Sequence, residues 1–172
     1  YEAKVVIVAT GGLSYPGTGS TGDGLRWAEE AGHKVVPCFP SLVPLVTKEE
    51  WPKQLEGLSL VNVNLTAWHG GRKLAAEFGE MLFTGCGVSG PIVLTLSRLI
   101  APLVAQEPGS VGLTIDLKPA LSFEELDLRI QRDFKEYSRK LYKNSLDDLL
   151  PRKIIPVIIE LSGIDPQNRS IK

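Results

Sequence analysis

The pattern in this sequence that could hold a cofactor is a glycine-rich loop close to its start. Residues 17–22 read Gly-Thr-Gly-Ser-Thr-Gly, which matches the G-x-G-x-x-G loop of dinucleotide-binding proteins. The glycines of such loops let the backbone approach a pyrophosphate at the N-terminus of the next helix. Here six residues separate Thr10, which ends the preceding apolar run, from Gly17, whereas the fingerprint turns directly off its strand. A pyrophosphate site is therefore disfavoured, and a loop whose glycines only permit tight turns stays open as the plainer interpretation.

A second candidate for chemistry is the segment 84–91, which reads Thr-Gly-Cys-Gly-Val-Ser-Gly-Pro. It is similar to the G-x-S-x-G turn that presents a nucleophilic serine, but Pro91 stands where the second glycine is needed. The two histidines, His33 and His69, lie in other segments, so no base is in evidence for Ser89. The sequence favours Ser89 as the N-cap of a helix with Pro91 in its first turn. A hydrolase is not predicted, and no catalytic residue is assigned.

The composition argues against several other classes of function. The two cysteines and two histidines stand singly at positions 33, 38, 69 and 86, without the spacing of metal ligands or of a disulfide framework. A formal net charge of -1 gives no basic surface for phosphates, so we expect neither a nucleic-acid nor a membrane partner. With 43% hydrophobic and 23% charged residues the chain should fold, and the lack of a secretory signal indicates the cytoplasm.

The elements that would position the glycine loop follow from the pattern of apolar residues around it. Residues 4–10 form a continuous apolar run, typical of a strand buried on both faces of a parallel sheet. Such a strand needs neighbours on both sides. We expect those neighbours to lie outside this chain, unless the run pairs at the edge of the later strands. After the loop, residues 23–31 predict a short helix that ends at Gly32.

The centre of the chain predicts an antiparallel sheet. Residues 58–68 alternate in polarity and lead through Gly70-Gly71 into a partner strand, the signature of a hairpin. The strands that we expect cover 58–68, 72–78, 81–84 and 111–117. The apolar stretch 92–105 is interrupted and falls short of the roughly 20 residues that span a bilayer, so it predicts a buried helix.

The sequence divides into three parts of different character. Prolines punctuate residues 33–46 and place a boundary near 34–40. After Pro119 helices are expected over 122–140, near 145–150 and over 152–162. The fold class is therefore α+β. It comprises a remnant of a Rossmann-like segment at 1–34, an antiparallel, β-rich and barrel-like subdomain at 35–118, and a small helical bundle at 119–172.

Several segments together resemble one known family. The chain reads Val-Ile-Val-Ala-Thr-Gly-Gly-Leu-Ser-Tyr-Pro at 6–16, Gly-Ser-Thr-Gly-Asp-Gly at 19–24, Leu-Val-Pro-Leu at 42–45, Glu-Met-Leu-Phe-Thr and Gly-Val-Ser-Gly-Pro within 80–91, and Leu-Lys-Pro at 117–119. Their order and spacing are similar to those of the YhiN/BaiN-type family of NAD(P)/FAD-dependent oxidoreductases. One departure matters. Many relatives have a histidine after the Phe-Thr, where this chain has Gly85, so no acid or base role is assigned there.

The resemblance implies a flavoprotein of which this chain is the middle part. In that family an N-terminal segment carries the FAD fingerprint, a C-terminal segment completes the flavin site, and a β-barrel with a helical bundle is inserted between them. Residues 1–34 would end the first FAD-binding segment. The partners would be the two missing segments of the same protein and a small organic substrate, with NAD(P)H as electron donor. The residues placed close to the FAD are Thr10, Gly11, Gly12, Ser14, Tyr15, Gly19, Ser20, Thr21 and Gly22.

We therefore expect the substrate-covering insert of an FAD-dependent oxidoreductase, inactive and unable to bind FAD tightly on its own. Two alternatives from other classes stay open. Residues 17–22 would serve a small autonomous nucleotide-binding module, and the β-rich core would suit a non-catalytic interaction domain. A G-x-G-x-x-G strand-helix unit upstream of this chain would decide for the flavoprotein.

Overall fold

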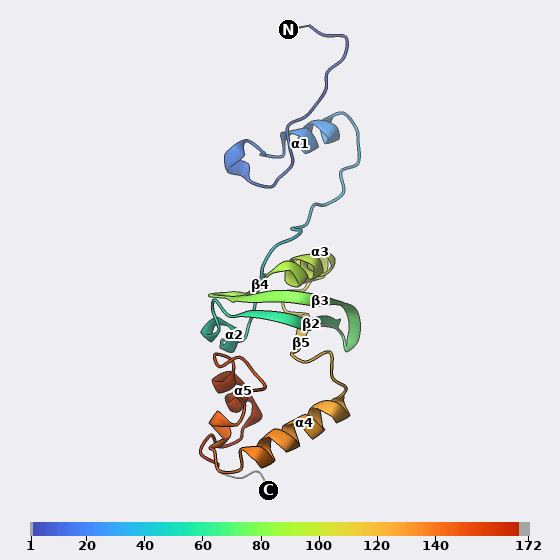
Figure 1. Cartoon of the computed structure of the whole chain (residues 1–172). Helices are drawn as coiled ribbons and strands as arrows, with labels where there is room; N and C mark the ends of the chain where they lie inside the picture. The colour runs from blue at the N-terminus through green and yellow to red at the C-terminus, as the bar shows by residue number, and fades with distance from the viewer. Residues whose placement is uncertain (1, 169–172) are drawn as a thin grey trace. The chain divides into compact units, whose positions relative to one another are not determined.

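The computed structural model describes residues 2–168. The chain divides into two compact units, Tyr1–Cys38 and Phe39–Lys172. The first unit, blue in Figure 1, contains a 3-10 helix, η1 (Pro16–Thr18), and the helix α1 (Asp23–Glu30). The prediction of a helix after the glycine loop is confirmed, and Gly32 follows it with a φ of 89°.

The strand expected over residues 4–10 is not formed. No strand in residues 2–168 begins before Leu45, and the apolar side chains of this run are exposed, Ile7 by 87% and Val8 by 55%. A continuous apolar run becomes a strand only between neighbouring strands that cover both its faces. Neither a parallel neighbour nor the alternative, pairing at the edge of the later strands, is found in the described residues.

The second unit is built on one five-stranded antiparallel sheet, curled into a half-barrel, which confirms the α+β prediction. In spatial order its strands are β1 (Leu45–Val46), β4 (Gly87–Ser89), β3 (Arg72–Thr84), β2 (Ser59–His69) and β5 (Val111–Asp116). The core beneath the sheet is apolar, and the side chains of Leu65, Ala67 and Phe83 are fully buried in it.

The hairpin of β2 and β3 forms the centre of this sheet. Gly70 and Gly71 make its turn with φ of 55° and 75°, as the sequence predicts. The strands predicted separately over 72–78 and 81–84 are one strand, because Gly79 stays in the ladder opposite Val63. The irregularity in the pairing of β2 with β3 lies in β2, where Asn62 has a φ of 56° and the register shifts.

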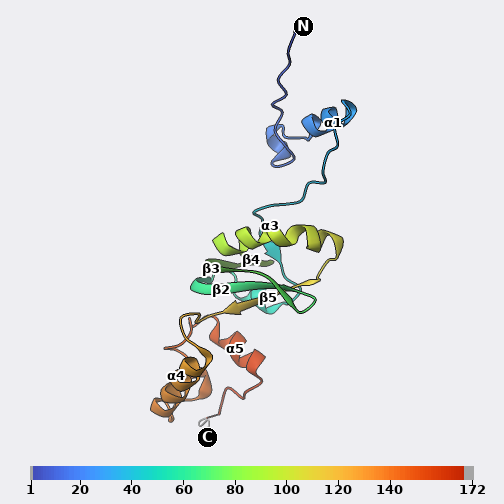
Figure 2. The same cartoon turned by 90° about the vertical axis from the view of Figure 1, so that its right-hand side faces the viewer.

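The helix α3 (Pro91–Gln106) covers one face of the sheet (Figure 2). The predicted buried helix is confirmed on the face that carries Ile92, Val93, Leu96 and Ile100, whereas Leu99 on the other face is 49% exposed. Ser97 is fully buried and accepts a hydrogen bond from the Val43 N–H (3.0 Å). Within residues 2–168 no helix combines the length and the hydropathy that a membrane crossing requires.

The prediction that Ser89 caps this helix is wrong by one residue. Ser89 is the last residue of β4, and the N-cap is Gly90, which has a φ of 98°. A Cβ at Gly90 would lie 2.9 Å from the Cα of Met81. The helix therefore starts too close to β3 for a side chain at this position, so glycine replaces the better capping residue serine. Pro91 occupies the first turn, as predicted.

Between β1 and β2 lies the short helix α2 (Trp51–Gln54), which the sequence did not predict. The part of the second unit that follows β5 is helical. It contains α4 (Phe123–Glu136), a 3-10 turn η2 (Tyr142–Asn144) and α5 (Ile155–Ser162). Ser122 caps α4 through a reciprocal pair of hydrogen bonds with Glu125 (3.2 and 2.8 Å). The helix predicted near 145–150 is wrong, because aspartates at 147 and 148 favour turns and Pro151 disfavours a helical residue before it.

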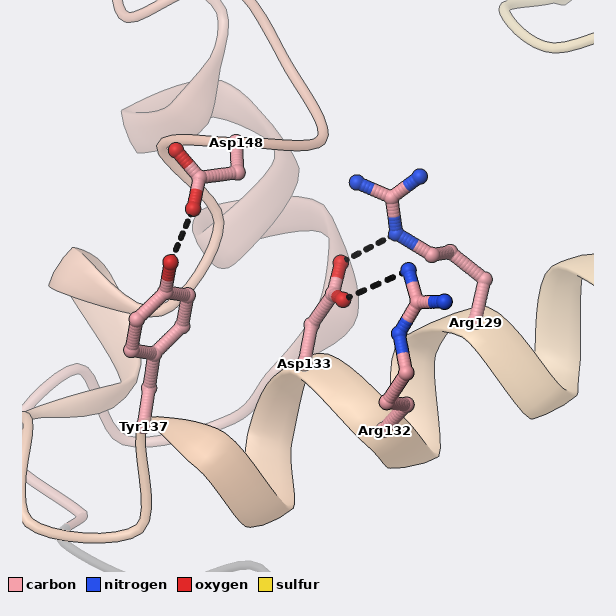
Figure 3. A network of polar contacts seen from close by, with 5 residues as sticks. All are labelled: Arg129, Arg132, Asp133, Tyr137 and Asp148. Carbon is pink, nitrogen blue, oxygen red and sulfur yellow. Dashed lines mark hydrogen bonds and ion pairs between the residues drawn. The ribbon is translucent and has the colours of Figure 1, made fainter.

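Polar contacts lie along the last turns of α4, and one of them joins its end to the turns that follow (Figure 3). The carboxylate of Asp133 is buried and accepts hydrogen bonds from Arg129 Nε (2.7 Å) and Arg132 Nη2 (3.4 Å). One turn later the Tyr137 hydroxyl donates a short hydrogen bond to Asp148. A buried carboxylate is costly unless charged partners and hydrogen bonds compensate it, so Asp133 depends on its two arginines.

The contact between Tyr137 and Asp148 should make the stability of the chain depend on alkaline pH. The hydrogen bond to Asp148 raises the pKa of Tyr137 from 10.0 to about 12, because the ionised phenol would face a carboxylate. Between these values the unfolded chain has lost the proton that the folded chain keeps, so the free energy of unfolding falls as the pH rises. We expect the urea midpoint to drop more steeply from pH 10 to 12 in the parent chain than in Tyr137→Phe. Equal slopes would show that this hydrogen bond is absent in solution.

Candidate functional site

The nine residues that the sequence assigns to FAD contact lie in one loop of the first unit. The base of the loop is closed by the Gly22 N–H, which donates a hydrogen bond to the Gly12 carbonyl oxygen (3.1 Å). Gly11 has a φ of 76°, and a Cβ there would lie 2.7 Å from the Oγ of Ser20. The loop itself therefore requires glycine at position 11, both for the backbone angle and for the close approach of Ser20.

The middle of the loop is the single 3-10 turn η1. Tyr15 precedes it with a φ of 55°, and Thr18 donates to the Tyr15 carbonyl oxygen from both its N–H (2.9 Å) and its Oγ1 (2.7 Å). Gly19 closes the turn with a φ of 94° and an N–H that donates to the carbonyl oxygen of Pro16 (3.0 Å). The Tyr15 side chain is 82% exposed, so its ring is available to stack on a flat ligand.

The N-terminus of α1 already carries a negative charge. Asp23, the first residue of the helix, accepts hydrogen bonds from Thr21 Oγ1 (2.8 Å) and Arg26 Nη2 (3.0 Å). These two contacts, the one from Thr21 first, lower the pKa of Asp23, so its carboxylate is ionised at neutral pH. A pyrophosphate needs the free positive end of a helix dipole, but here it would meet a like charge. The geometry thus disfavours the loop as the anchor of a dinucleotide.

The structure brings part of the predicted site together. Thr10, Gly11 and Gly12 lie along one side of the loop base, and Ser20 and Gly22 lie on the other. The remaining predicted residues do not join this cluster: Ser14, Tyr15 and Gly19 flank the outer turn, and Thr21 is engaged with Asp23. Whether any of them contacts FAD stays a prediction.

One residue of this cluster, Gly24, belongs to the motif at 19–24 but is not among the nine residues assigned to FAD contact. A Cβ at Gly24 would overlap the Oγ1 of Thr10, so Gly24 is what lets α1 pack against the start of the loop. The signal was present in the sequence. A glycine inside a helix costs about 1 kcal/mol relative to alanine, so its occurrence at the second position of α1 indicates a packing requirement.

Gly12 differs from the other glycines at the base of the loop. A Cβ built on it meets no atom within 4 Å, and its φ lies outside the left-handed region. Nothing in the described residues therefore requires glycine at this position. A ligand that approached the backbone of Gly12 closely would supply such a requirement.

The turn between β3 and β4 does not form a nucleophile site in the described residues. Cys86 is exposed, and its Sγ lies 3.8 Å from Thr84 Oγ1. Of the two histidines, His69 is directed to Glu107, with 3.7 Å between Nε2 and Oε2, and not to Ser89. Residues 2–168 also contain no group of three or more metal-ligating side chains.

Comparison with known proteins identifies most of the second unit. Residues 39–172 match the sequence profile of the family described as "HI0933-like protein barrel and H2TH domain". The match covers the sheet, α3 and the helical part, and so includes the curled sheet that the sequence predicted as barrel-like.

Three curated relatives extend the similarity across both units. A ribosomal RNA dihydrouridine synthase of Haemophilus influenzae is 36% identical over 162 residues, which cover 93% of this chain and 37% of the relative. The protein of the same description from Escherichia coli is 33% identical over 92% of this chain and 37% of its own length. A 3-dehydro-bile acid delta(4,6)-reductase of Clostridium scindens is 29% identical over 95% of this chain and 40% of its own length. The chain thus spans about two fifths of the relatives that it matches.

Proposed function

The chain belongs to the HI0933-like family of flavoprotein oxidoreductases, and from this membership we propose that it forms part of an FAD-dependent reductase. This is the YhiN/BaiN-type family whose motifs the sequence carries. The reaction that we propose is the reduction of a carbon–carbon double bond conjugated with a carbonyl group. FAD, when bound and reduced by NAD(P)H, would supply the hydride for this reaction.

The names of the relatives point to one chemical class of substrate. A dihydrouridine carries two hydrogens that uridine lacks, added across the C5–C6 double bond that is conjugated with the C4 carbonyl. A delta(4,6)-reductase of a 3-dehydro-bile acid acts on double bonds conjugated with a 3-oxo group. In such conjugated systems a hydride would add to a double-bond carbon remote from the carbonyl, because the carbonyl group draws electrons from that carbon, and a proton would complete the reduction. One organic framework thus accounts for both relatives.

Uridine in ribosomal RNA is the substrate that we propose for this protein. The observation that carries the proposal is the 36% identity to a ribosomal RNA dihydrouridine synthase over 93% of the chain, against 29% for the bile acid reductase. The proposal sets aside our expectation of no nucleic-acid partner, which rested on the net charge of the whole chain. Reduction of ribosomal RNA would also place the protein in the cytoplasm, with the ribosomes.

The residues of the first unit fit a partial contact with FAD. We propose that Thr10, Gly11 and Gly12 lie against the cofactor while the residues Ser14 to Pro16 and Gly19 to Gly24 form a wall beside it. The pyrophosphate would be held by segments of the same protein outside this chain, because Asp23 occupies the N-terminus of α1. Two observations support this: the chain spans 37–40% of its relatives, and Val5 to Val8 leave an apolar run without neighbours.

The substrate can be tested in the protein that includes both proposed FAD-binding segments. Incubated with NADPH or NADH and unmodified ribosomal RNA, it should produce dihydrouridine, which mass spectrometry of digested nucleosides detects by its two added hydrogens. A 3-oxo-4,6-diene steroid serves as the parallel substrate. Reduction of the steroid alone would show that RNA is not the substrate. If a protein that holds FAD reduces neither compound, the proposed reductase activity is wrong.

The place of the cofactor can be tested at Gly12. In the same longer protein, Gly12→Val should weaken FAD binding by about tenfold or more, which corresponds to a loss of 1.4 kcal/mol, and so lower the fraction of molecules that carry FAD. Gly112→Val is the matched control, since a Cβ at Gly112 also meets no atom within 4 Å. The ratio of flavin to protein absorbance measures the result. Full flavin occupancy in Gly12→Val would show that the cofactor does not lie against this loop.

A further inference from the structure

The charged side chains of the helical part are distributed unevenly. Residues 129–153, which we call the basic segment, contain eight lysines and arginines but four aspartates and glutamates, in a chain whose net charge is -1. The eight are Arg129, Arg132, Lys135, Arg139, Lys140, Lys143, Arg152 and Lys153, and all except Arg129 are exposed. A net charge summed over the whole chain conceals this local excess of four positive charges.

Part of the negative charge in the basic segment is already compensated. Asp133 is buried and paired with Arg129 and Arg132 (Figure 3), so the charges of these two arginines are also engaged within the chain. By contrast, Lys135, Arg139 and Lys143 form no ion pair within the part of the chain that the structure describes. These three side chains are therefore available to an anionic partner.

A groove of about 820 Å³ borders the basic segment between η2 and α5. It is lined by the apolar side chains of Ile155, Pro156, Ile159 and Ile164, and by Lys143 and Arg152 from the basic segment. A volume of this size lies within the range of small-ligand sites, about 300–1,000 Å³. The combination of apolar walls with cations beside them suits a molecule that has a flat uncharged ring and an attached phosphate.

The groove also contains negative charge, which limits what can enter it. The carboxylates of Asp147, Glu160 and Asp165 line it, and Asp147 lies 3.9 Å from the Nε of Arg152. They repel a phosphate inside the groove. A polyanion would consequently stay along the exposed cations of the basic segment, and only an uncharged group would enter between the apolar side chains.

From this arrangement we propose that the basic segment is an RNA-binding surface. Its exposed lysines and arginines contact the phosphates, and the groove takes up one unstacked base of the same strand. Proteins commonly recognise RNA in this way, by phosphate contacts along a basic surface and by enclosing bases that are splayed out of the helix. The inference deepens the proposed function and rests on it, because that function supplies RNA as the partner.

Charge removal tests the phosphate contacts in the full chain. The triple variant Lys135→Gln/Arg139→Gln/Lys143→Gln should bind a labelled ribosomal RNA fragment on the order of 100-fold more weakly at roughly 0.1 M salt. The slope of log K against log salt should fall by about 2, since each lost contact to a single strand removes about 0.7. The control is Arg72→Gln/Lys73→Gln/Arg98→Gln, which removes the same charge from exposed positions on β3 and α3. Equal losses in both variants would show that only net charge matters and would overturn the surface.

A second pair of variants tests the groove. Ile164→Glu places a carboxylate in its wall, whereas Leu161→Glu makes the same change at a 60% exposed residue of α5 outside the groove. We expect Ile164→Glu to weaken RNA binding about tenfold more than Leu161→Glu does, which corresponds to 1.4 kcal/mol. Far-ultraviolet circular dichroism checks that both variants are folded. Equal affinities would remove the groove from the proposal.

The binding assay separates this inference from the proposed function. Dihydrouridine formation together with unchanged RNA affinity in the triple variant would refute the surface and leave the reductase intact. If the parent protein reduces only the steroid but the triple variant loses RNA affinity, RNA is not the substrate and the RNA-binding surface is still supported. If the chain instead sediments with phosphatidylglycerol vesicles through these residues and does not retain RNA, the surface is a membrane contact and the proposal is wrong.

Discussion

The isolated 172-residue chain is expected to purify colourless, without FAD. A dinucleotide is held mainly by its pyrophosphate on a helix N-terminus and by a ribose contact to an acidic side chain. In this chain the N-terminus of α1 carries the Asp23 carboxylate, so the contacts that we propose between this loop and FAD do not include the pyrophosphate. Contacts to charged groups contribute about 1.5–3 kcal/mol each. Without them, binding should weaken by several orders of magnitude, at about tenfold per 1.4 kcal/mol.

Gel filtration after incubation with excess FAD measures this directly. The protein peak of the isolated chain should lack absorbance near the flavin band, and the longer protein that includes both proposed FAD-binding segments should be yellow. The longer protein is thus the control for the cofactor preparation. Stoichiometric FAD on the isolated chain would mean that the loop anchors the cofactor by itself, against the argument from Asp23.

The largest effect on stability is expected from Phe83→Ala. The Phe83 ring is fully buried in the core and meets Trp51 edge to face, with 5.9 Å between ring centroids. Removal of a buried phenylalanine leaves a cavity and costs about 3–5 kcal/mol. Because the total stability of a domain is only about 5–15 kcal/mol, the variant should lose a large part of it.

Phe78→Ala is the matched control for this change. Phe78 lies on the same strand, β3, but its side chain is 64% exposed, so its removal should change the free energy of unfolding by about 0.5 kcal/mol or less. Urea unfolding of the two variants, followed by circular dichroism, gives both values. A loss in Phe78→Ala equal to that in Phe83→Ala would show that the exposed face of the sheet is covered in solution.

The elements that could be predicted from the sequence are those whose causes lie close together in the chain. The alternation of β2 and the two glycines of its turn specify the central hairpin locally, and the capping box of Ser122 with Glu125 specifies the start of α4. Position Gly90 could not be foreseen, because the requirement comes from the approach of Met81. Residues 4–10 have the sequence of a buried strand but do not form one, because no neighbouring strand is found for them among the described residues.

The candidate site was predictable to a similar extent. The glycines at positions 11 and 22 have backbone reasons that any tight loop shares, so they identify the loop but not its ligand. The resemblance to the family selected FAD, and the family membership is now shown by the match over residues 39–172. The role of Asp23 was missed, because only the three-dimensional contacts with Thr21 and Arg26 reveal how its charge is fixed at the helix end.

The position of β5 in the chain leaves one edge of the sheet unpaired during synthesis. Four of the five strands lie within residues 45–89, whereas β5, which covers the free edge of β2, follows only after α3. A hairpin forms in about 1–10 μs, but synthesis at about 5–20 residues per second needs seconds to reach the end of β5. During that interval the nascent chain exposes the backbone of β2 along its length, which is the edge on which misassembly with another chain would begin.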